Sequence, residues 1–148
     1  MLNVVDIQKI LPHRFPFLLI DRVEKVENGK YIEAYKNVTI GEQIFQGHFP
    51  EHPIYPGVMI IEGMAQAGGV LAFISMNKDE QKDTKDKVVY FMSIDRAKFR
   101  VPVTPGDKLV YKLEVLKHKG NIWVLDAKAY TDDKLVAEAE LKAMVVDK

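Results

Sequence analysis

The chain contains no cysteine, and this absence excludes several kinds of chemistry. Without thiols there is no disulfide bond, no thiolate metal ligand and no cysteine nucleophile. The first residues, MLNVVDIQKILPHR, also lack the basic segment followed by an apolar segment that marks a secretory signal peptide. Both features fit a reducing compartment, so we expect a cytoplasmic protein.

An excess of charge is also missing, because 21 Lys and Arg residues balance 21 Asp and Glu residues. A chain without a global positive field is not expected to bind nucleic acid. The longest apolar stretch, residues 58–76, is interrupted by Glu62, Gln66 and several glycines. A membrane span needs about 20 mainly apolar residues. This stretch is therefore expected to be a helix buried in protein.

The 148 residues contain no internal repeat or long linker, so residues 1–148 are expected to form one domain. A short helix is expected over 3–11, with Asn3 as its N-cap. Two runs rich in β-branched and aromatic residues, 17–27 and 30–39, flank Asn28-Gly29. Asn-Gly between such runs predicts a β-hairpin.

Three prolines, Pro50, Pro53 and Pro56, exclude regular structure from most of residues 40–56. Gly57–Met76 then reads as a long helix that is apolar nearly all round, and the polar run 77–87 reads as a solvated connection. Strand-like runs follow at 88–103, 107–118, 121–131 and 134–146. The pattern predicts an α+β fold in which one antiparallel sheet packs on, and curls around, the long helix.

Glu62 is the most informative residue of that helix, because its neighbours are apolar and no Lys or Arg lies between residues 37 and 77. A buried carboxylate without a cation is costly. A protonated or pocket-lining Glu62, suited to general acid catalysis, is favoured. The alternative is a helix residue that reaches solvent or a subunit surface. Gln66, one turn later, either hydrogen-bonds Glu62 or is another polar residue at an interface.

His48 lies in the proline-braced loop before the helix and is a candidate proton acceptor. The alternative is a structural loop histidine, and His52 competes for the same role. His13 and His118 are expected to be ordinary surface or strand residues. A zinc site built from histidines and Glu62 is conceivable, but the spacing matches no recognised ligand pattern.

Gly57 begins the long helix, where backbone N–H groups have no partner within the helix. Such a group could stabilise a developing oxyanion, for instance on a thioester carbonyl. The residue alone equally fits a flexible helix start.

These residues stand in the stretch GHFPEHPIYPGVMIIEGMAQAGG, which resembles the signature of bacterial 3-hydroxyacyl-[acyl-carrier-protein] dehydratases of the FabZ type. ILPHRFPFLLIDRV and DRAKFRVPVTPGDKL also resemble that family, so the likeness covers essentially the whole chain. It implies a hot-dog fold, dimers that associate into a hexamer, and an active-site tunnel at each dimer interface.

The resemblance further implies the reaction and its residues. A 3-hydroxyacyl chain, carried on the phosphopantetheine of acyl carrier protein in type II fatty acid biosynthesis, loses water to become a trans-2-enoyl chain. His48 removes the α-proton, and Glu62 of the other subunit helps the hydroxyl leave, directly or through a water. Glu62 in place of the aspartate usual in FabA-type relatives favours dehydration without isomerisation. No cofactor and no metal are expected.

Further positions follow from the same likeness. The substrate-binding residues would be Gly57, Val58, Gln66 and Tyr90. Tyr90 falls where the family has a tunnel-gating residue, and its alternative reading is an aromatic residue of the sheet core. Because acyl carrier protein is acidic, the alternating cations Arg96, Lys98 and Arg100 are expected to dock it; their alternative is ordinary strand solvation.

Two other functions compete with dehydration. A hot-dog thioesterase would use the same fold and a carboxylate but would release the free acid. A non-catalytic acyl-binding module would leave the thioester unchanged, since a pocket on a shared fold does not prove turnover.

Overall fold

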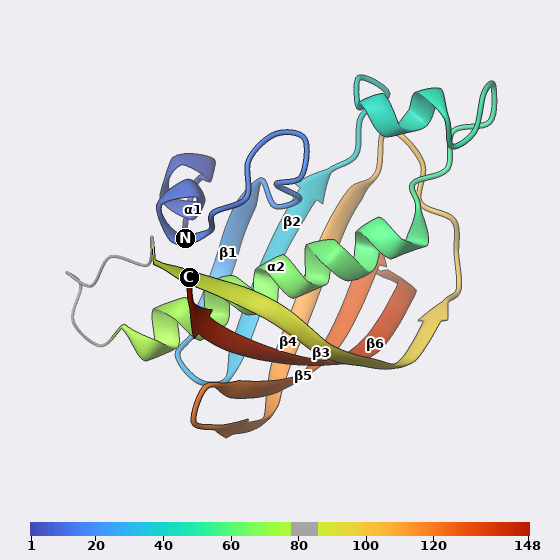
Figure 1. The fold of residues 1–148 in the computed structure, drawn as a ribbon. Coiled ribbons are helices and arrows are strands. Elements are labelled where there is room, and N and C mark those ends of the chain that lie inside the picture. The colour runs from blue at the N-terminus through green and yellow to red at the C-terminus, as the bar shows by residue number, and fades with distance from the viewer. Residues whose placement is uncertain (78–85) are drawn as a thin grey trace.

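A six-stranded antiparallel sheet curls around one long helix in the computed structural model, which describes residues 1–77 and 86–148 (Figure 1). The elements, in chain order, are α1 (Val4–Ile10), β1 (Arg22–Glu27), β2 (Tyr31–Asn37), the 3-10 helix η1 (Gln43–Gln46), α2 (Gly57–Met76), β3 (Lys87–Phe99), β4 (Lys108–Lys119), β5 (Ile122–Thr131) and β6 (Lys134–Asp147). The strand order is β1-β2-β4-β5-β6-β3. The predicted α+β architecture is confirmed. Most of the predicted polar connection, residues 78–85, lies outside the described residues.

Helix α2 has the predicted bounds, and it is buried because it is apolar on nearly every side. It contacts β2, β4, β5 and β6. Close approach to the sheet needs glycine at two positions: a Cβ on Gly63 would overlap the Tyr111 hydroxyl, and one on Gly68 would overlap Leu125. Among the described helices α2 alone is long and apolar enough to cross a membrane, and 67% of that apolar window is buried inside the protein.

Strands β2, β5 and β6 alternate buried and partly buried side chains as predicted for half-buried antiparallel strands, most regularly β5. The Asn28-Gly29 hairpin is confirmed, since Glu27 pairs with Tyr31 and Gly29 has a φ of 72°. Positive φ suits glycine, which has no Cβ to clash.

Two predicted strand bounds are wrong. β1 begins at Arg22 rather than residue 17, because the chain before it bonds to core side chains instead of a neighbouring strand. The Leu19 N–H donates to Gln66 Oε1 at 2.8 Å, and the Leu19 carbonyl accepts from the Tyr111 hydroxyl at 3.1 Å. We call residues 12–21 the strap. β3 ends at Phe99 rather than 103, shortly before Pro102, which has no N–H to donate.

Candidate active site

Glu62 lies on a stripe of α2 that faces a cavity between the helix, the strap and β3. Residues at spacings of three and four share one side of a helix. The helix contributes Glu62, Ala65, Gln66, Gly69 and Phe73 to the cavity wall; the chain around the strap contributes Leu11, Pro12 and His13; β3 contributes Val89 and Phe91. The Glu62 side chain is 21% exposed, so the prediction of a pocket-lining carboxyl group is confirmed for the single chain.

Gln66 holds Glu62 and the strap at the same time. Its side-chain NH₂ donates to Glu62 Oε1 at 3.0 Å and to the Phe17 carbonyl at 2.7 Å, while its oxygen accepts from the Leu19 N–H. At 2% exposure, Gln66 has both ends of its amide satisfied. Of the two alternatives for Gln66, the hydrogen bond to Glu62 is the one found.

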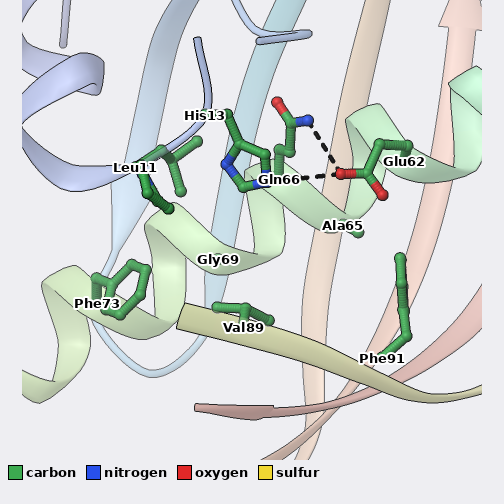
Figure 2. Close-up of a pocket in the computed structure, with 10 residues that line it drawn as sticks. Leu11, His13, Glu62, Ala65, Gln66, Gly69, Phe73, Val89 and Phe91 are labelled. Carbon is green, nitrogen blue, oxygen red and sulfur yellow. Dashed lines mark hydrogen bonds and ion pairs between the residues drawn. The ribbon is translucent and has the colours of Figure 1, made fainter. Parts of the chain in front are cut away.

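His13 also lies in this cavity, which contradicts the expectation of an ordinary surface or strand residue. Its Nε2 atom is 3.6 Å from Glu62 Oε1 (Figure 2). Burial lowers the pKa of the His13 imidazole below its usual value; the Glu62 carboxylate partly raises it, and Arg14 lowers it further. No local sequence pattern predicts this contact, because residues 13 and 62 meet only through the fold of the strap.

His48 is half-buried in the loop between η1 and α2, and its ring is oriented by the main chain. Nδ1 lies 2.6 Å from the Ile54 carbonyl oxygen. A carbonyl only accepts, so Nδ1 must carry the proton, and the Nε2 lone pair is left free. The ring also stacks on Phe49, with centroids 4.0 Å apart. This tautomer is the one that can accept a proton from a substrate.

Gly57 and Val58 provide the first two amides of α2, which have no partner within the helix. Phe99 packs so closely on Gly57 that a Cβ there would overlap its ring. A groove beside this helix start is lined by Ile54, Tyr55, Gly57, Val58, Ile60, Phe99, Arg100, Val101, Pro102 and Val103. His48 lines neither the Glu62 cavity nor this groove.

A second, apolar space adjoins the Glu62 cavity and shares Ala65, Gly69, Val89 and Phe91 with it. Its other walls come from α2, β5 and β6: Gly68, Ala72, Trp123, Leu125, Leu141, Ala143 and Val145. None of the described residues that line this space is charged. It therefore offers an apolar continuation behind the carboxyl group.

Tyr90 lies outside the Glu62 cavity, whereas its neighbours Val89 and Phe91 line it. Alternate residues of a strand point to opposite faces, and Tyr90 is 58% exposed. The alternative of an aromatic core residue is therefore wrong for the single chain. A gating role remains a prediction for an assembled site.

The three cations at the end of β3, Arg96 and Lys98 within the strand and Arg100 just after it, differ in their pairing. Arg96 contacts Glu140 at 2.7 Å and Arg100 contacts Glu138 at 3.1 Å. The hydrogen bond from Arg100 holds the pKa of Glu138 below its usual value. Lys98 lies opposite Glu138 in the strand register but makes no ion pair with any described residue. Much of the arginine charge is thus already matched by β6.

The remaining histidines do not join the site. His52 is exposed, and His118 stacks on Trp123 with ring centroids 3.6 Å apart. Within residues 1–77 and 86–148, no group of three or more His, Asp or Glu side chains is arranged to hold a metal ion.

The fold and the sequence can both be compared with known proteins. The chain matches the FabA-like domain family over residues 11–140. A chain of the dehydratase heterocomplex ApeI:P from Xenorhabdus doucetiae superposes with a TM-score of 0.82 at 18% identity, covering 96% of this chain and 91% of that one. A hot-dog-like protein from Thermanaerovibrio acidaminovorans gives 0.58 at 19% identity, covering 83% and 85%. The protein is therefore a hot-dog fold protein with a FabA-like domain.

A closer likeness lies in sequence. The chain is 77% identical over 148 residues to the 3-hydroxyacyl-[acyl-carrier-protein] dehydratase FabZ of Campylobacter curvus (strain 525.92), covering 100% of both chains. This chain belongs to the FabZ family of 3-hydroxyacyl-[acyl-carrier-protein] dehydratases.

Proposed function

We propose that this protein dehydrates (3R)-hydroxyacyl chains carried on acyl carrier protein to trans-2-enoyl chains, in type II fatty acid biosynthesis in the cytoplasm, with His48 as base and Glu62 as acid. The observation that carries the residue assignment is the orientation of the two groups. The Nδ1 bond to Ile54 leaves His48 Nε2 free, and Gln66 contacts only one oxygen of Glu62. A base and an acid are both needed for elimination next to a carbonyl.

His48 Nε2 takes the proton from the carbon next to the thioester, and the released electron pair forms the new double bond. The bond between the third carbon and the hydroxyl oxygen breaks, and Glu62 gives its proton to that oxygen, so that water leaves. The Gly57 N–H would bind the thioester oxygen as negative charge develops there. No oxidant, metal or cofactor is required.

The acyl chain would extend into the apolar space behind Glu62, which measures about 10 Å³ in the single chain and would have to widen to admit it. Its walls are aliphatic or aromatic and include Ala72, Trp123 and Leu141. Burial of apolar surface contributes about 25 cal/mol per Å², so such walls favour an alkyl chain over water. Val58 and Tyr90 would border the entrance.

We further propose that the site is completed by a second copy of the chain. β3 is an edge strand paired only with β6, and it exposes Tyr90, Met92 and Ile94. An exposed apolar edge is suited to pairing with another strand. A dimer through β3 would allow Glu62 to meet His48 of the partner subunit, and three such dimers would form the hexamer.

Carrier-protein docking would use the three cations at the end of β3. Because Arg96 and Arg100 are paired with glutamates, Lys98 is the residue whose charge is most available to an acidic partner. Lys98→Glu should raise KM for carrier-linked substrate more than for a pantetheine-linked one. Equal effects on both substrates would contradict docking at this strand.

The product of a 3-hydroxyacyl thioester tests the reaction itself. An enoyl thioester without free thiol supports dehydration, whereas free thiol indicates a thioesterase and unchanged substrate a binding module. His48→Ala and Glu62→Gln should each fold yet lose about 100- to 10,000-fold in rate. Full dehydration by either folded variant would exclude that residue from the pair.

A further inference from the structure

We propose that His13 is a positioning residue that fixes which oxygen of Glu62 carries the acid proton. This inference rests on the proposed role of Glu62 as the general acid. Both nitrogen neighbours of the Glu62 carboxyl group approach the same atom: Gln66 Nε2 lies 3.0 Å from Oε1, and His13 Nε2 lies 3.6 Å from it. The other oxygen, Oε2, points away from both neighbours (Figure 2).

The tautomer of His13 follows from its surroundings. Its Nδ1 atom is buried and has no hydrogen-bond partner among the described residues. A proton on Nδ1 would therefore be a buried donor without an acceptor, which is costly. A proton on Nε2 instead faces Glu62 Oε1. The neutral Nε2–H form is thus favoured, and this is the reverse of the tautomer that Ile54 imposes on His48.

The Gln66 N–H donates to Oε1, and His13 Nε2 faces the same atom from 3.6 Å, too far for a hydrogen bond but close enough to disfavour a proton there. A protonated carboxyl group has one O–H donor, and its second oxygen remains an acceptor. With Oε1 accepting from Gln66 and facing His13, the proton of Glu62 belongs on Oε2. That is the oxygen free to meet the leaving hydroxyl, so the contacts on Oε1 orient the acid without blocking it.

His13 can do this only while it is neutral. Its charged neighbours are Glu62, on α2, and Arg14, on the strap, whose guanidinium donates to the carbonyls of Gln8, Leu11 and His13. The other described residues that line the cavity carry no charge. Burial, the largest effect, lowers the pKa of His13 and favours the neutral ring. A protonated His13 would stabilise the Glu62 carboxylate, which has no proton to donate.

An NMR titration of histidine labelled with ¹⁵N tests the contact without using catalysis. In the unmodified protein His13 should be the Nε2–H tautomer at pH 7 and should titrate below 6.5, its ordinary value. Wherever Glu62 is ionised, its carboxylate raises the pKa of His13, so Glu62→Gln should lower that pKa further. His118, which contacts Gly120 and Trp123 instead, should titrate identically in both proteins. An Nδ1–H tautomer of His13 at pH 7 in the unmodified protein would overturn the inference.

Two substitutions test the consequence for catalysis. His13→Gln keeps an N–H donor, whereas His13→Leu fills similar space without one. The leucine variant should lose about tenfold in kcat with little change in KM, and the glutamine variant should recover most of that loss. Equal kcat values in the two variants, at equal melting temperature, would show that His13 only fills space. Dehydration that survives in Glu62→Gln would instead overturn the proposed function, whatever the His13 titration shows.

Discussion

The two edge strands of the sheet differ: β1 is covered by other parts of the chain, whereas the outer edge of β3 is unpaired. At β1 the chain closes its own edge: the Leu2 N–H donates to the Val23 carbonyl at 2.9 Å, and the Val23 N–H donates to the Leu2 carbonyl at 3.0 Å. Helix α1 lies beside the same strand (Figure 1). β3, a strand of thirteen residues, pairs with β6 alone, and Tyr90, Met92 and Ile94 remain about half exposed.

The difference indicates what each edge is for. Unpaired edge strands invite association, so most proteins shorten, charge or cover them. The β1 edge is covered by this chain, whereas the β3 edge is long and apolar, as a surface for a partner would be. Val89 and Phe91 of the open strand also line the Glu62 cavity. We therefore expect that pairing of β3 with a second subunit also completes the active site.

A charge on the open edge should have the largest effect. Ile94→Asp would place a carboxylate on the surface proposed to pair with the second subunit, where its desolvation is costly. We expect monomers by analytical ultracentrifugation and a loss of dehydration of about 100-fold or more, as for removal of one of the proton-transfer groups. Leu116→Asp, an exposed apolar position on β4, is the control and should stay assembled and active. An active Ile94→Asp monomer would contradict the link between edge and site.

The strap, which leads into β1, can be destabilised by a substitution in the core beneath it. Gly63→Ala places a methyl group where the Tyr111 hydroxyl lies, and that hydroxyl holds the strap through Leu19. Overpacking of this kind typically costs about 1–3 kcal/mol. Urea unfolding should show that loss, and adding Tyr111→Phe should restore part of it by making room. No change in Gly63→Ala would mean that the helix and sheet are less closely packed than described.

Most of the helices and strands can be predicted from the sequence because the patterns that specify them are local. Asn28-Gly29 specifies the hairpin, Pro56 and the apolar run specify α2, and alternation specifies the last strands. The proline-braced loop and the carboxyl group in an apolar helix also mark His48 and Glu62 as candidates. Each of these signals lies within one element or between neighbours in the chain.

The strap and His13 could not be predicted in this way. Leu19 meets Gln66 across 47 residues and Tyr111 across 92, and no local pattern reports such partners. The apolar run around Leu18 to Ile20 has the sequence pattern of a buried strand. A segment buried by hydrogen bonds to side chains needs the same apolar residues as a segment buried in a sheet, so the sequence does not distinguish the two. Likewise, His13 acquires chemical meaning only once the strap lies over Glu62.

A smaller loss is expected where α1 covers the closed edge. The Asn3 side chain caps this helix by accepting a hydrogen bond from the Asp6 N–H at 3.0 Å. The Asp6 carboxylate in turn accepts from the Asn3 N–H at 3.2 Å. Loss of such a cap costs about 1 kcal/mol, so Asn3→Ala should lower the unfolding free energy by that amount. Asn3→Ser, which can still cap, should lose little. Faster amide exchange at Val23 would locate the effect at the edge, and equal stability of the two variants would contradict it.

The smallest effect is a dependence of stability on pH at the strap. The unfolded chain protonates His13 near pH 6.5, whereas burial lowers the pKa in the folded chain. Protonation of His13 therefore favours unfolding. Its contribution leaves the free energy of unfolding unchanged well above pH 6.5 and lowers it as the pH falls below that value. His13→Gln should lose less stability than the unmodified protein between pH 7.5 and 5.5, at equal protein concentration. Identical losses would indicate that His13 titrates alike in both states.

Mixing two inactive variants tests most directly whether the open edge completes the site. In a dimer of one His48→Ala subunit and one Glu62→Gln subunit, a site shared across the interface would carry both substitutions at one position and neither at the other. Random reassociation of equal amounts should then restore about a quarter of the original dehydration rate, because half of the dimers are mixed and each has one intact site. A mixture as inactive as its two components, with exchange of subunits demonstrated, would contradict the shared site.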